Sequence, residues 1–149
     1  MDFVQMTRDE ILDEWRHDGY IDPAHLDRES LDIPRLHAKY IRYLSNEKML
    51  LRASQSEYKK LYLTKYVWIT QGDTKETKEK GWELPPQGCI MKVEVDKFLD
   101  ADEDLIKSRF KIFGQEEKVR ILDDIMKSIH SRNFLIRAAI DFQRFQAGN

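Results

Sequence analysis

The sequence is poor in three residue types that mark other classes of protein. Among its 149 residues there is one cysteine, Cys89, so neither an intrachain disulfide nor a multi-thiolate zinc site can form. Only six glycines and four prolines are present, whereas 35% of the residues are charged. This composition favours a soluble helical protein, and the length predicts one domain over 1–149.

Targeting and catalytic motifs are also missing. No run approaches the roughly 20 apolar residues of a membrane-spanning helix, and the opening MDFVQMTRDE has no basic region followed by an apolar block. We therefore expect a cytoplasmic protein with no membrane partner. Neither GxGxxG nor GxxxxGK(S/T) occurs, and the Asp100, Asp102 and Asp104 triplet lacks the glycine and glutamate that complete a calcium loop. We predict no enzymatic activity, no cofactor and no metal.

The charge is unevenly distributed, although the net charge is only −2. Residues 1–34 hold ten acids and three bases, a net charge of −7, and residues 35–66 hold eight bases and two acids, a net charge of +6. Two interpretations remain open. The basic segment either attracts an anion such as nucleic acid, or pairs with the acidic segment of its own or a neighbouring chain.

Apolar spacing predicts two long helices, at about 34–69 and 115–146. The second helix is partly apolar around roughly two thirds of its circumference, so it must be buried from more than one side. We therefore predict a subunit interface along it, formed by Leu122, Ile125, Ile129, Ile136, Ile140 and Phe142.

The remaining signals are shorter, and the fold class they predict is all-α. Helices are expected at 8–17, from the capping box of Thr7 and Glu10, and at 23–30. The partly alternating segment 89–95 allows a short strand or an extended arm, and a strand at 61–69 competes with the first long helix. The chain then divides into a basic helical part, a loop connector and an oligomerisation part, at 1–69, 70–98 and 99–149.

Lysines and aromatic residues are interleaved in YKKLYLTKYVW, residues 58–68. Proteins that bind single-stranded DNA typically join a basic track to aromatic rings on which bases stack. On the helix predicted at 34–69, Tyr66 lies near the basic side chains. Lys65 instead falls among the apolar side chains of that helix, so it must emerge at the helix end or at an interface. The residues predicted to contact DNA are Arg42, Lys48, Arg52, Lys59, Lys60, Lys65 and Tyr66.

Three segments resemble the UvsY family, the recombination mediators of T-even-like bacteriophages. They are DGYID (18–22), LDADEDLIK (99–107) and the closing SRNFLIRAAIDFQRFQAGN. The resemblance implies a helical, non-enzymatic protein of the host-cell cytoplasm. It also implies a homo-oligomeric ring of about seven subunits, a heptamer, tied together by the C-terminal helix. Its members help a RecA-like recombinase assemble on single-stranded DNA coated by the phage single-strand-binding protein.

The family's DNA-binding motif, similar to LKxRL, corresponds here to LYLTKY at 61–66. Its two basic positions fall on Tyr62 and Thr64, so the resemblance leaves Lys59, Lys60 and Lys65 as substitutes. The alternative function is a non-enzymatic helical scaffold for protein–protein interaction that does not bind DNA.

Overall fold

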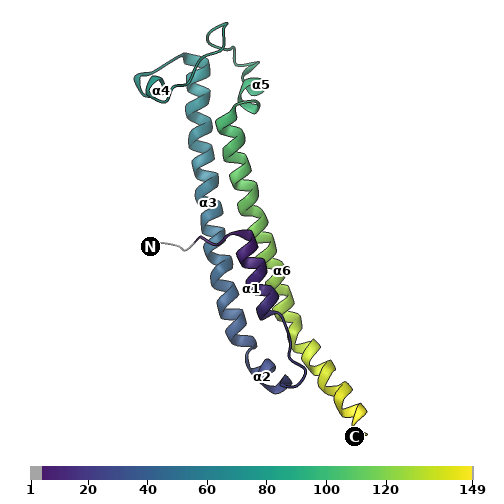
Figure 1. The fold of residues 1–149 in the computed structure, drawn as a ribbon. Coiled ribbons are helices and arrows are strands. Elements are labelled where there is room, and N and C mark those ends of the chain that lie inside the picture. Colours follow the sequence, from purple (N-terminus) through teal and green to yellow (C-terminus); the bar gives the residue numbers. More distant parts are fainter. Residues whose placement is uncertain (1–4, 149) are drawn as a thin grey trace. The chain divides into compact units, whose positions relative to one another are not determined.

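The computed structural model describes residues 5–148, and all regular structure in that range is α-helical (Figure 1). The all-α fold class is therefore confirmed. The helices are α1 (Arg8–Asp18), α2 (Leu26–Leu31), α3 (Ile33–Gln71), α4 (Lys75–Glu79), α5 (Val95–Asp100) and α6 (Glu103–Gln146). Asn149, the last residue of the C-terminal signature, lies outside the described range.

The long helices α3 and α6 contain the two predicted segments. α6 begins earlier than predicted, at Glu103, because the Asp102 carboxylate accepts a hydrogen bond of 3.0 Å from the Leu105 N–H and caps the first turn. Gly114 lies inside α6 and does not interrupt it.

Neither segment considered for a strand forms one. Residues 61–69 lie within α3. Residues 89–94 form a bend and a turn. The Ile90 N–H donates to the Ile69 carbonyl and the Glu94 N–H to the Met91 carbonyl, both at 2.9 Å, and Val95 already belongs to α5. A strand needs a neighbouring strand for its remaining backbone groups, and none of the described residues provides one.

The N-terminal helices follow their capping residues. Thr7 and Glu10 form the expected capping box at the start of α1. α2 begins at Leu26 rather than at residue 23, because the Asp22 side chain accepts a hydrogen bond of 2.9 Å from the Ala24 N–H and holds a turn before the helix.

The chain divides into two compact units. The first runs up to Leu50 and resumes at Gln115, and the second is Leu51–Gly114. α3 and α6 each contribute one segment to either unit. Whether the chain behaves as one domain stays a prediction.

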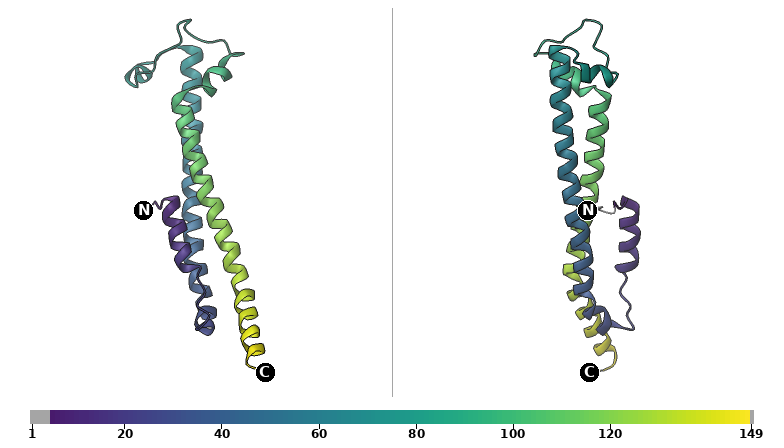
Figure 2. Two further views of the ribbon diagram at one scale, coloured as in Figure 1. Left: turned by 45° about the vertical axis from the view of Figure 1, so that its right-hand side comes forward. Right: turned by 90° about the vertical axis from the view of Figure 1, so that its left-hand side faces the viewer.

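The core of the first unit forms where α1 packs against α3 and α6. Figure 2 shows α1 as a separate short helix flanking α3. The Trp15 ring meets the Tyr40 ring edge-on at 5.3 Å between centroids. The buried members are Ile11, Leu36, Tyr40, Leu44, Leu122, Ile125, Met126 and Ile129.

The core of the second unit joins the end of α3 to α5 and the start of α6. Tyr58, Tyr62 and Tyr66 of α3 and Trp82 of the connector are partly buried against it. Its buried members are Trp68, Ile69, Ile90, Val95, Leu99 and Leu105.

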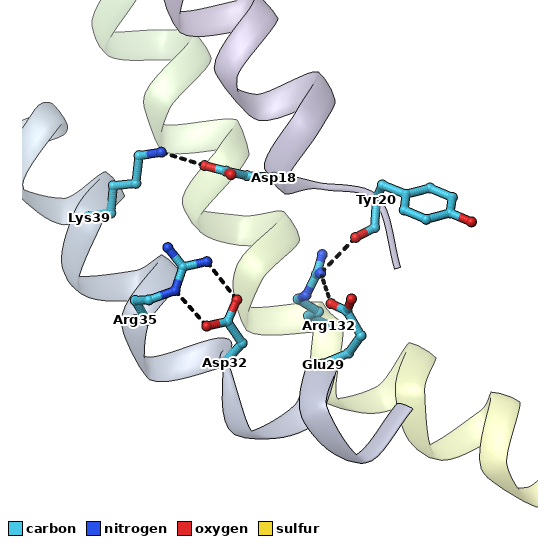
Figure 3. A network of polar contacts seen from close by, with 7 residues as sticks. All are labelled: Asp18, Tyr20, Glu29, Asp32, Arg35, Lys39 and Arg132. Carbon is cyan, nitrogen blue, oxygen red and sulfur yellow. Dashed lines mark hydrogen bonds and ion pairs between the residues drawn. The ribbon is translucent and has the colours of Figure 1, made fainter. Parts of the chain in front are cut away.

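Arg132 of α6 holds the α1–α2 connection and α2 against α6 within the first unit (Figure 3). Its side chain is buried, and its guanidinium donates hydrogen bonds to the carbonyls of Gly19 (3.0 Å) and Tyr20 (3.1 Å). The same group pairs with Glu29 of α2 at 2.9 Å. One buried cation therefore fixes both the α1–α2 connection and α2.

Arg132→Met should lower the free energy of unfolding by about 3 kcal/mol, because it leaves Glu29 and two carbonyls without their donor. Urea unfolding measures the loss. The matched control is Arg120→Met, which removes an exposed arginine paired only at the surface and should change stability little. An equal loss in both variants would contradict a structural role for Arg132.

Candidate nucleic-acid interface

The acidic N-terminal segment neutralises the first two bases of α3. Lys39 Nζ lies 2.6 Å from an Asp18 carboxylate oxygen, and Arg35 donates to Asp32 at 2.7 Å (Figure 3). Burial alone would raise the pKa of Asp18, but hydrogen bonds from Lys39 and Tyr40 outweigh it and hold that pKa below its ordinary value. Pairing within the chain thus accounts for Arg35 and Lys39.

Two further predicted DNA contacts lie on the part of α3 in the first unit. Arg42 is exposed and forms no ion pair within residues 5–148. It borders a shallow hollow that is also lined by Ala38 and Tyr43. Lys48 is exposed and lies 4.0 Å from Asp123, at the limit of an ion pair. Both cations can be reached from solvent.

The part of α3 in the second unit carries a basic face, formed by Arg52, Lys59 and Lys60. Spacings of seven and eight residues place these side chains on one side of the helix. All three are exposed, and none forms an ion pair with any residue in the described range. The positive charge of this face is therefore uncompensated among residues 5–148.

Glu57 lies three residues before Lys60 on α3 and is already engaged. Glu57 accepts a hydrogen bond of 3.1 Å from Lys111 of α6, and both side chains are largely exposed. Such a surface pair contributes little to stability and exchanges readily. Glu57 is therefore shared between Lys111 of α6 and the surrounding solvent.

Lys65, by contrast, is buried and neutralised. Its Nζ lies 3.0 Å from Asp102 and 2.8 Å from Asp104, at the start of α6. The ammonium also sits 3.8 Å from the centre of the Trp82 ring and 5.2 Å from that of Trp68. This environment explains a lysine in the apolar stripe of α3. Its role as a DNA contact stays a prediction.

The aromatic residues of YKKLYLTKYVW mainly build the core of the second unit. Tyr58, Tyr62 and Tyr66 are partly buried against that core. Trp68 is buried, and its indole N–H donates to Asp73 at 2.8 Å. Stacking on Tyr66 stays a prediction, with only part of its surface open to a base.

Most of the residues predicted to form a subunit interface are buried within a single chain. Leu122, Ile125 and Ile129 belong to the core of the first unit, and Ile136 is also buried. Ile140 is half-buried, whereas Phe142 is 60% exposed. The burial of the first four needs no second subunit, and their part in association stays a prediction.

A C-terminal apolar stripe on α6 remains uncovered in the first unit. It consists of Phe134, Leu135, Phe142 and Phe145, of which Phe145 is 78% exposed. Contiguous exposed apolar residues of this size mark interaction surfaces. The sequence shows them as apolar, but periodicity alone does not separate them from core residues.

Two exposed aromatics were not predicted as site residues. Phe110 and Phe113 of α6, in the second unit, stand among basic residues in the stretch KSRFKIF, 107–113. This interleaving of bases and aromatics is the signal that could have found them.

The described part of the chain has neither a candidate metal site nor a membrane-spanning helix. Among residues 5–148, no group of three or more histidine, cysteine, aspartate or glutamate side chains could hold a metal ion. No described helix is long and apolar enough to span a bilayer.

Comparison with known proteins identifies a family. A family model described as recombination, repair and single-stranded DNA binding protein UvsY matches residues 14–149. No curated protein matches the sequence.

Solved structures of the recombination mediator protein UvsY of bacteriophage T4 share the fold. One crystal form matches with a TM-score of 0.77 and 22% identity, covering 96% of this chain and 99% of that one. A second form gives a TM-score of 0.75 and 21% identity, with 91% and 98% covered. A third gives 0.76 and 18%, with 95% and 99% covered.

Asp104→Asn should make stability less dependent on pH in acid. The hydrogen bond from Lys65 lowers the pKa of Asp104 in the folded chain, so below its ordinary value of 3.8 the unfolded chain binds more protons. The contribution of the pair is complete above about pH 4 and is lost as the pH falls through the lower folded-state pKa. Urea unfolding measures the free energy of unfolding of wild type and variant. The difference between the two values should be smaller at about pH 3 than at about pH 6. If that difference is the same at both pH values, the Lys65–Asp104 pair does not make stability depend on protonation of Asp104.

Proposed function

The chain belongs to the UvsY family of recombination, repair and single-stranded DNA binding proteins, and we propose that it acts as a recombination mediator. In this role it helps load a RecA-like recombinase onto DNA coated by the phage single-strand-binding protein. The observation that carries the proposal is the basic face of α3, where three exposed cations have no partner within the described chain.

The basic face holds the phosphates of the strand in this proposal. Arg52, Lys59 and Lys60 each release a condensed counterion when they replace it at a phosphate, which makes binding sensitive to salt and tolerant of sequence. Arg42 and Lys48 are exposed on the same helix and serve as further contacts. A contact by Lys65 stays a prediction, and it requires a phosphate to displace two carboxylates that already surround its ammonium.

Assembly of several copies turns a weak site into a strong one. The C-terminal apolar stripe of α6 is the surface that supports association into a homo-oligomeric ring, which the family resemblance puts at about seven subunits. Each additional basic face on the same strand then binds as an intramolecular event. A strand that is wrapped in this way is loosened from its coating protein and becomes available to the recombinase.

Replacing Lys59 and Lys60 together by alanine should weaken binding of oligo-dT about tenfold at ~0.1 M salt, because two phosphate contacts are lost. The slope of log affinity against log salt should fall by about 1.4, at about 0.7 for each contact to a single strand. Fluorescence anisotropy across a salt series measures both quantities.

The matched control removes two other exposed lysines of the second unit, Lys75 and Lys78 of α4, with the same change in net charge. This control variant should retain nearly the wild-type affinity for oligo-dT and nearly the wild-type slope of log affinity against log salt. An equal effect of both pairs would assign the binding to net charge rather than to the basic face. Absence of binding by the wild-type chain at low salt would favour a protein scaffold that does not bind DNA.

Phe142→Asp should give smaller particles in sedimentation velocity, because it places a charge within the C-terminal apolar stripe. Circular dichroism should show an unchanged helical fold, since Phe142 is exposed in the chain. Ile125→Asp serves as the contrast and should unfold the first unit, because Ile125 is 3% exposed in its core. If Phe142→Asp gives particles of the same size as the wild type, the C-terminal apolar stripe is not part of the subunit interface.

A further inference from the structure

The second unit exposes an aromatic surface on α6 that its core does not use. Phe110 is 75% exposed and Phe113 58%, and Ile106 precedes them one turn earlier. Spacings of three and four residues place these side chains next to one another on the helix, at about 5–6 Å between Cβ atoms. No described residue of the second unit covers the two rings.

Gly114 leaves bare backbone beside these rings. Glycine inside a helix weakens it relative to alanine, and one use of glycine is to let another group approach the backbone closely. A Cβ added at Gly114 would meet no atom within 4 Å, so nothing inside the chain requires the missing side chain. The backbone at this position is therefore open to a group from outside.

Two lysines are neighbours of the rings in the sequence of α6. Lys107 is exposed and forms no ion pair within residues 5–148, and Lys111 is held only by its exposed pair with Glu57. That pair links α6 to the helix that carries the basic face, since Glu57 is one turn from Lys60 on α3. A negatively charged ligand with flat apolar groups would fit both the charge and the rings.

We propose that Phe110 and Phe113 are stacking platforms for bases of single-stranded DNA. The inference rests on the proposed function, because the same strand lies with its phosphates on the basic face. The α3 tyrosines are partly buried in the core, and Trp82 covers Lys65, so these two phenylalanines are the most accessible rings of the second unit. Stacking on aromatic rings accepts any base, in keeping with binding that tolerates sequence.

An abasic oligonucleotide separates stacking from phosphate contacts, because it keeps the charge of the strand and removes its bases. The wild-type chain should bind oligo-dT more tightly than an abasic strand of equal length. Replacing Phe110 and Phe113 together by alanine should weaken oligo-dT binding roughly tenfold and leave binding of the abasic strand unchanged. Tryptophan at both positions should restore the preference, whereas leucine, which is apolar but not aromatic, should not.

Ile106→Ala is the matched control on the same surface, since isoleucine cannot stack, and it should keep the preference for oligo-dT. If the alanine variant still prefers oligo-dT as the wild type does, while Lys59→Ala with Lys60→Ala weakens binding, the stacking inference is wrong and the proposed function stands. If the alanine variant instead gives smaller particles in sedimentation velocity, the rings form a subunit contact and the inference is overturned. Failure of the wild type to bind either strand would sink the proposed function as well.

Discussion

A buried cation must be paired, because leaving it without a counter-charge costs several kcal/mol, and each unit contains one such centre. In the second unit the Lys65 ammonium draws Asp102 and Asp104 to the end of α3, and Trp82 closes over it. The start of α6 and the connector are positioned by that contact. In the first unit Arg132 does the same for the turn after α1 and for α2.

The same pairing rule sorts the charges of the chain into those used for folding and those left for a ligand. Asp18 and Asp32 neutralise Lys39 and Arg35, so the acidic N-terminal segment is engaged at the first turns of α3. Arg52, Lys59 and Lys60 follow later on the helix and remain uncompensated in the described chain. A protein with a net charge of only −2 can therefore still present a positive surface to a polyanion.

Local patterns predicted the helices well, because a helix depends on neighbours in sequence. The absence of glycine and proline from 35 to 71 anticipated α3, and the capping box at Thr7 anticipated α1. The strand considered at 89–95 does not form, because a strand depends on a partner that may lie anywhere in the chain.

The candidate site was less predictable, because periodicity shows which residues are buried but not what buries them. Leu122 and Ile125 fit a subunit interface by spacing, yet they pack inside the chain. Lys65 has the sequence context of a DNA contact, but its partners lie at the start of α6, far away in the sequence. Phe110 and Phe113 lie before residue 115, where the apolar pattern of the predicted long helix begins, so that pattern did not include them.

The tryptophans are divided between the two units, and this gives the chain a separate optical probe for each. Trp15 stands edge-on to Tyr40 in the first unit, whereas Trp68 and Trp82 meet at 5.4 Å in the second. With Trp15 replaced by phenylalanine, the indole emission comes from the second unit alone. Intrinsic fluorescence of this variant then follows the unfolding of the second unit, without any attached dye. A complementary variant that keeps only Trp15 reports in the same way on the first unit.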